Sequence, residues 1–164
     1  MKTIFPSVAF ILFLSFLTAC TVEEEEIALL EQIPTVSLFI DNEEVPTIHR
    51  PVCWNNCFNI DQNLSVHDGD IALLDPIPVT HGQEVEIVVN DQFIDINNPQ
   101  EPIFWLDVHE GSQSTSGIEL EDSSFRIDSF GPEVTYRVYT DYTNAEDQRI
   151  GIVMTMILFE VSGN

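Results

Sequence analysis

Hydrophobic and polar residues alternate along most of the chain from residue 34 onward, with the two-residue period that is typical of β-strands. The clearest case is the segment 84–90, in which three inward apolar positions alternate with glutamates on the opposite face. By the same criterion, further strands are predicted at 36–40, 45–49, 64–67, 71–74, 103–109, 125–129, 133–142 and 150–161. No segment after residue 33 has a helical period, so the chain is predicted to be all-β.

The connections between the predicted strands favour a β-sandwich. Asn42-Glu43 and Asp68-Gly69 each separate two predicted strands and predict hairpin turns. Strands that recur about every eight to twelve residues, with turn residues between them, are typical of antiparallel sandwiches. The last strand, 150–161, is apolar on both faces. We therefore expect it to be covered on both sides, or to present one face as a contact surface.

The second half of the chain resembles bacterial immunoglobulin-like (Ig-like) domains. Gly82–Ile87 resembles the start of strand B, Trp105 occupies the position of the strand C tryptophan, and Gly131–Val138 resembles strand F with Tyr136 as its corner tyrosine. The resemblance covers about residues 70–162 and lacks the cysteine pair that often joins strands B and F. It implies an Ig-like antiparallel β-sandwich with an N-terminal hairpin extension, and it implies no activity.

The N-terminal residues have the pattern of a targeting segment. Lys2 precedes an apolar run at 4–17, which is shorter than a membrane-spanning helix requires. The run ends in Leu17-Thr18-Ala19-Cys20, which resembles the lipobox of bacterial lipoproteins. The resemblance implies that residues 1–19 are a signal peptide cleaved before Cys20, and that Cys20 carries the lipid anchor to the membrane.

An acidic tether is predicted between the anchor and the sandwich. Residues 20–33 contain the run Glu23–Glu26, which is similar to the acidic tracts of surface-exported lipoproteins in Bacteroidetes. Thr21 follows the cysteine in place of the Asp that marks inner-membrane retention, so we expect the outer membrane. Whether the protein faces the periplasm or the cell surface stays open. The single folded domain is predicted at 34–164.

The charge of the chain limits its partners. The 164 residues include 28 acidic and 5 basic ones, giving a net charge of −23. Cleavage after residue 19 would leave four arginines and no lysine, which gives 4 − 28 = −24. Such a surface repels nucleic acid and anionic headgroups, so neither is an expected partner. Weak binding of divalent cations or of a cationic partner is the functional alternative to simple solubility.

Two cysteines remain for the folded domain, and an oxidising compartment favours their pairing. A disulfide between Cys53 and Cys57 requires that Trp54-Asn55-Asn56 turn, so the two cysteines are predicted to flank a three-residue hairpin loop. A copper or zinc site formed by His49, Cys53 and Cys57 is the alternative, because thiolates and imidazole suit these metals. Redox activity of the cysteine pair is a third interpretation.

The other candidate ligands are weaker. His67 and His81 lie beside turn residues, and a shared zinc site is the alternative to a local role for them. The acid-rich loops 91–98 and 141–147 have oxygen ligands suited to Ca²⁺, although neither has the spacing of an EF-hand. The Ser-rich segment 112–116 is predicted to be a flexible loop.

The sequence contains no hydrolase elbow, phosphate-binding loop or zinc-protease motif, so we expect a protein that is not an enzyme and has no cofactor. The leading hypothesis is a lipid-anchored, non-catalytic interaction or structural module of the outer membrane or cell surface. Its loops, or the apolar face of 150–161, would contact an envelope protein or a glycan. The alternative hypothesis is an extracytoplasmic protein that handles copper, zinc or calcium.

Overall fold

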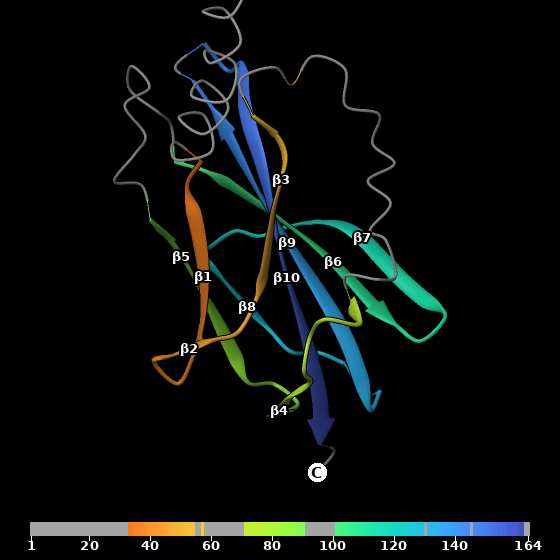
Figure 1. Ribbon diagram of the computed structural model, residues 1–164. Coiled ribbons are helices and arrows are strands. Elements are labelled where there is room, and N and C mark those ends of the chain that lie inside the picture. Colours follow the sequence, from red (N-terminus) through yellow and green to blue (C-terminus); the bar gives the residue numbers. More distant parts are fainter. Residues whose placement is uncertain are drawn as a thin grey trace, which may run out of the picture. The chain divides into compact units, whose positions relative to one another are not determined.

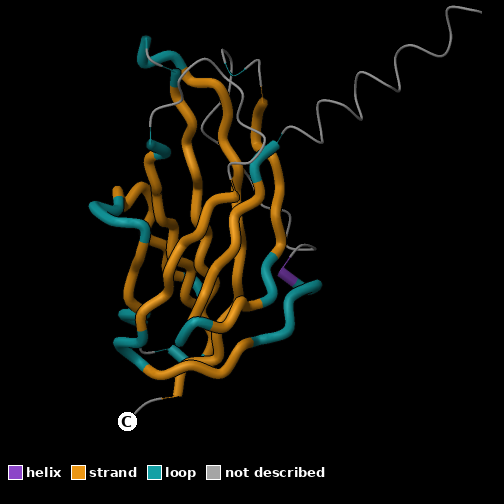
Figure 2. Tube along the Cα trace, turned by 90° about the vertical axis from the view of Figure 1, so that its left-hand side faces the viewer, coloured by secondary structure: helices purple, strands orange, loops and turns teal. Residues whose placement is uncertain are grey.

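Strands with alternating burial form two sheets within the unit 34–164 (Figures 1 and 2). The computed structural model describes residues 33–54, 57, 71–90, 101–129, 131–144 and 146–162. The strands in these ranges are β1 (Thr35–Ile40), β2 (Glu43–Val45), β3 (Ile48–Trp54), β4 (Ile77–Thr80), β5 (Glu84–Asn90), β6 (Ile103–Glu110), β7 (Gln113–Glu119), β8 (Ser124–Arg126), β9 (Glu133–Thr143) and β10 (Arg149–Ser162).

The two sheets pack against each other, which confirms the predicted all-β sandwich. Sheet A has the strand order β2–β1–β5–β8, and sheet B has the order β3–β10–β9–β6–β7. Strand β4 is added to sheet B beside the C-terminal part of β10. All pairings are antiparallel except β4–β10, which is parallel. In the described ranges, no helix is long and apolar enough to cross a membrane.

The core lies between the sheets and is formed by the predicted inward positions. On β5, Val85 and Ile87 are buried while Glu84 and Glu86 are exposed, as the alternation predicts. Tyr136 of β9 stacks on Phe125 of sheet A, with ring centroids 5.1 Å apart, and meets Phe159 of β10 edge-on at 5.6 Å. Each buried aromatic side chain stabilises the fold by about 1.5–3 kcal/mol, so these rings make a main link between the sheets.

The predicted N-terminal hairpin is present, but it is part of the sandwich rather than an appendage. Asp41 and Asn42 form its turn with φ values of 51° and 66°, the left-handed conformation of a type I′ turn. The turn therefore comes one residue earlier than predicted. Strand β1 lies between β2 and β5 in sheet A, and its side chains Val36 and Leu38 are completely buried.

The predicted single strand at 45–49 is wrong. Strand β2 ends at Val45, and β3 begins at Ile48 in the other sheet. Pro46 separates the two strands, and proline cannot donate a hydrogen bond to a strand ladder. The chain therefore crosses from sheet A to sheet B at this point.

Strand β10 is covered on both faces. It pairs with β9 along one edge, while β3 and β4 share its other edge. Met156 and Ile157 point to opposite faces, and neither side chain is exposed at all. Of the two predictions for 150–161, burial on both sides is therefore confirmed, and the apolar contact surface is wrong.

Three further local predictions are wrong or lie outside the described residues. Residues 71–74 form a helical turn, closed by the amide of Leu74 donating to the carbonyl of Ile71 at 3.0 Å. Alanine and leucine in this run favour a helical turn over a strand. The partner strand predicted at 64–67 and its turn lie outside the described residues. The segment 112–116 was predicted to be a loop, but its residues 113–116 lie in strand β7.

The two aromatic residues that carry the Ig-like resemblance differ in their placement. Trp105 does not enter the core: its neighbours Phe104 and Leu106 point inward and are buried, so Trp105 lies on the opposite, outer face of sheet B. Tyr136 is buried and its hydroxyl oxygen accepts a hydrogen bond from the backbone of Asp128, in the connection that precedes β9. The predicted core tryptophan is therefore wrong, because the alternation of β6 is shifted by one residue.

Candidate functional site

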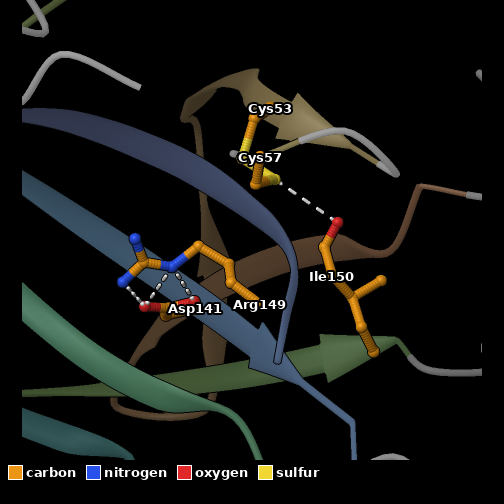
Figure 3. The surroundings of a disulfide bond; sticks show 5 residues. All are labelled: Cys53, Cys57, Asp141, Arg149 and Ile150. Carbon is orange, nitrogen blue, oxygen red and sulfur yellow. Dashed lines mark hydrogen bonds and ion pairs between the residues drawn. A yellow bond between two sulfur atoms is a disulfide. The ribbon is translucent and has the colours of Figure 1, made fainter. Parts of the chain in front are cut away.

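The predicted disulfide is present at one edge of sheet B (Figure 3). Cys53 lies near the end of β3 and is bonded to Cys57, with their Cα atoms 5.5 Å apart. Both residues are half-buried. The Cys57 sulfur lies 3.4 Å from the carbonyl oxygen of Ile150 on β10. Residues 55 and 56 lie outside the described residues, so the predicted hairpin loop between the cysteines does too.

The predicted copper or zinc ligands have other partners. The disulfide uses both sulfurs, which leaves no thiolate for a metal. His49 has one ring nitrogen 3.1 Å from the Thr155 hydroxyl and the other 2.9 Å from the Thr47 hydroxyl. Partial burial lowers the pKa of His49. The negative charge of Glu44 acts in the other direction and has the smaller effect. Across the described ranges, no group of three His, Cys, Asp or Glu residues is placed to hold a metal ion.

The acid-rich loop 141–147 is closed by bonds within the protein. The carboxylate of Asp141 accepts hydrogen bonds from the Arg149 guanidinium at 2.6–3.0 Å in a two-pronged ion pair (Figure 3). The Asn144 side-chain oxygen accepts the amides of Glu146 and Gln148, both at 2.9 Å. These oxygens are therefore engaged by donors of the same loop. The other loop, 91–98, lies outside the described residues, as do Cys20 and His67.

The disulfide lies next to a tight aromatic contact. Trp54 follows Cys53 on β3 and reaches across Gly151 of β10 to Tyr142 of β9, meeting it edge-on with ring centroids 5.5 Å apart. A Cβ atom on Gly151 would overlap the Trp54 ring. Glycine at this position therefore permits the indole to span a whole strand.

The outer face of sheet B carries a cluster of chemically active side chains that the sequence analysis missed. It consists of Trp105, Asp107 and His109 from β6 and Arg137 and Tyr139 from β9, and we call it the outer cluster. Trp105 lies opposite Tyr139, and Asp107 lies opposite Arg137. All five side chains are half-buried. Within each strand these residues are two positions apart, so they lie on one face of the strand. Both strands were predicted from the sequence, and this spacing could have identified the shared face.

Three members of the outer cluster, Asp107, Arg137 and Tyr139, are joined by hydrogen bonds, whereas His109 Nε2 and Arg137 Nε are buried without a hydrogen-bond partner in the described part of the chain. The Tyr139 hydroxyl is hydrogen-bonded to Asp107 and Arg137, and burial followed by the Asp107 charge raises its pKa. Asp107 also accepts the backbone amide of Gly117 at 2.9 Å, which ties β6 to β7. Burial followed by the nearby Arg137 charge lowers the pKa of His109. We therefore interpret the outer cluster as a brace across three strands.

An open groove lies beside the beginning of β6 and the end of β7. It has a volume of about 620 Å³, and the apolar part of its lining includes Ile87, Val89, Phe104 and Leu120. Four exposed carboxylates line it as well: Glu101, Glu119, Glu121 and Asp122. None of its lining residues is a base. We call this feature the acidic groove.

Strand β7 leads to the acidic groove and forms an open edge of sheet B. It is the last strand of that sheet in the described part of the chain, and all seven of its residues are exposed. The turn at Gly111, with φ of 58°, joins it to β6. In Figure 1 this hairpin extends away from the other strands. A strand with one unpaired edge presents backbone donors and acceptors to a partner.

No protein-family model, curated protein or solved structure matches this chain.

Proposed function

We propose that this chain is a lipid-anchored protein of the outer membrane and that its β-sandwich is a non-catalytic binding module. The single observation that supports binding is the open edge of β7 beside the acidic groove. The edge offers a row of backbone groups, and the groove offers apolar and charged surface at the end of that row. At the disulfide the two cysteines bond to each other, and in the outer cluster Tyr139 bonds to Asp107 and Arg137.

The proposed anchor rests on the lipobox-like segment Leu17–Cys20. The disulfide between Cys53 and Cys57 agrees with an oxidising compartment outside the cytoplasm. An Ig-like topology is the finer proposal for the fold. Its support is the parallel pairing of β4 with β10 and the bond between Tyr136 and the connection before β9.

The anchor is tested by metabolic labelling. The full chain is produced in bacteria that are fed labelled palmitate, next to the variant Cys20→Ser and a control in which Cys53 and Cys57 are both serine. We expect label and membrane fractionation in the wild type and in the control, and loss of both in Cys20→Ser. Persistent label in the Cys20→Ser variant would contradict the proposed anchor.

The binding role is tested on cells by site-specific photo-crosslinking. A photoreactive amino acid replaces Thr115 on β7 in one strain and Val88 on the exposed face of β5 in another. We expect a discrete cross-linked species from position 115 that position 88 does not give. Equal products from both positions, or none from position 115, would contradict a binding role for this edge.

A further inference from the structure

The open edge of β7 lacks most of the features that prevent strands from pairing with other chains. The segment Gln113–Glu119 contains no proline, lysine or arginine, and its one charged residue is the last. Natural proteins usually protect exposed edges with such residues. The first three residues, up to Thr115, pair with β6 in a regular register. This stretch therefore has the geometry to receive an added strand.

A bulge connects the open edge to the acidic groove. Ile118 lies opposite Leu106 and Thr115 lies opposite Val108, so two residues of β7 face Asp107 alone. Gly117 adopts φ of 72° there, a conformation that glycine tolerates without strain. A chain paired with the first part of β7, up to Thr115, would reach Glu119 about 13 Å further along, at roughly 3.3 Å per residue.

The negative charges of the groove favour a partner chain with basic side chains. Four carboxylates line the groove without a base among the lining residues, and the whole chain has a net charge of −23. A second copy of the chain would add a further large negative charge at the same place. A metal ion also fits poorly, since no three-ligand group occurs in the described part of the structure. Lys or Arg side chains complement these carboxylates, and their apolar stems suit the floor at Phe104 and Leu120.

We infer that β7 and the acidic groove together bind an extended, basic segment of a partner protein. The segment adds to sheet B antiparallel to β7, and its N-terminal Lys or Arg side chains enter the acidic groove. Antiparallel addition continues the pairing of β6 with β7 and forms the more stable type of ladder. This inference rests on the proposed binding role and names the class of partner.

The probe is an acetylated peptide, Lys-Leu-Lys-Gly-Thr-Val-Thr-Val-Thr, with fluorescein at its C-terminus. Its binding to the detergent-solubilised full chain is measured by fluorescence anisotropy at low and high salt. A peptide with Glu in place of both Lys residues is the charge control. We expect the basic peptide to bind, its affinity to fall with added salt, and the acidic peptide to show no binding.

Matched variants distinguish the effect of the groove carboxylates on peptide binding from the effect of the protein's overall negative charge. The groove variant carries E101Q, E119Q, E121Q and D122N. The control variant carries E43Q, D75N, E133Q and E160Q, which remove the same charge at exposed positions. Two of the control positions, Glu133 and Glu160, lie opposite each other at one end of β9. The groove lies near the other end of β9, where Asp141 is opposite Ile103. We expect the groove variant to lose about tenfold in affinity and the control variant to lose less than twofold.

Backbone methylation of the probe tests strand addition. N-methyl groups are placed on alternate residues of the Thr-Val block, in one phase or in the other. Because alternate amides of an added strand point toward its neighbour, one phase should abolish binding and the other should preserve it. Equal loss in the groove and control variants, or equal binding of both methylated peptides, would overturn the inference.

A dimer of the full chain through β7 would also overturn it, and sedimentation velocity detects that outcome. Thermal unfolding followed by circular dichroism verifies that each variant is folded. The proposed function fails separately: if position 115 cross-links to an envelope component but the basic peptide does not bind, only the present inference is wrong.

Discussion

The contact between Trp54 and Gly151 offers the sharpest test of the packing described above. The perturbation is Gly151→Ala, which adds one methyl group to β10. Its Cβ would overlap the indole atom Cε3 and lie 3.0 Å from Cδ2. Carbon atoms in normal contact are about 3.5–4.0 Å apart, so the ring or the strand must move. The ring is also in contact with Tyr142, which limits its movement away from β10.

The magnitude follows from two opposing effects. Overpacking of a well-packed site costs about 1–3 kcal/mol. Without the ring, alanine in a strand should be more stable than glycine by about 0.5–1 kcal/mol, because glycine loses more conformational freedom on folding. We therefore expect Gly151→Ala to lower the free energy of unfolding by about 2 kcal/mol in the wild type. In a Trp54→Ala background we expect a small gain, which makes the coupling about 2–3 kcal/mol.

The assay is urea unfolding of the full chain carrying Cys20→Ser, followed by circular dichroism. A loss of 2 kcal/mol corresponds to a decrease of about 1 M in the urea midpoint for a domain of this size. Ser114→Ala on the exposed strand β7 is the control and should shift stability by less than about 0.5 kcal/mol. If Gly151→Ala costs the same with and without Trp54, the ring is not the obstacle and the reasoning is refuted.

Three further predictions concern the disulfide and titration. Replacing Cys53 and Cys57 by serine should lower the free energy of unfolding by about 2 kcal/mol, because the loop they close is short, and a urea midpoint equal to that of the wild type would contradict this. The pKa values of His49 and His109 are lowered in the folded protein, so these histidines bind protons more readily in the unfolded chain. As the pH falls below 6.5, proton binding therefore favours unfolding. The contribution of the two neutral histidines to stability is complete above pH 6.5 and decreases below it. Replacing both histidines by glutamine should reduce the slope of unfolding free energy against pH between about 5 and 7, and an unchanged slope would count against it. Burial raises the pKa of Tyr136 to about 12, so its contribution is complete below pH 10 and is lost as the pH rises toward 12; Tyr136→Phe should be less sensitive to pH in this window, as judged by thermal unfolding.

Strong alternation allowed several elements to be predicted closely from the sequence. The segment 84–90 is strand β5 with the predicted faces buried and exposed. The segments 133–142 and 150–161 correspond to β9 and β10 within two residues at each end. In these strands the side chains themselves decide which face is buried, so the local pattern contains the information.

Weak or mixed patterns failed, because pairing with neighbours decided the outcome. Strand β7 is rich in serine and glycine and has low strand propensity, yet β6 pairs with it along its length. The segment 45–49 was expected to be one strand, but Pro46 divides it between two sheets. On β6, apolar residues at 103–106 left the inward face ambiguous, and packing against sheet A selected Phe104 and Leu106 in place of Trp105.

The candidate sites divide in the same way. The disulfide joins residues four apart, so composition and chain geometry were sufficient to predict it. The acidic groove joins residues from β5, the start of β6 and the connection after β7. The outer cluster joins two strands about thirty residues apart along the chain. Neither could be predicted without the order of strands in the sheets.

The sequence by itself therefore determined the all-β class, the main strands and the disulfide, because each depends on the period of side chains or on residues close along the chain. Only the tertiary structure decided that the chain crosses to the other sheet between β2 and β3, that Trp105 faces outward and that β7 forms an open edge beside four carboxylates. These features depend on which strands are neighbours and in what register. A shift of one residue in register turns a whole strand over, and such choices are made by packing between segments that lie far apart in the sequence.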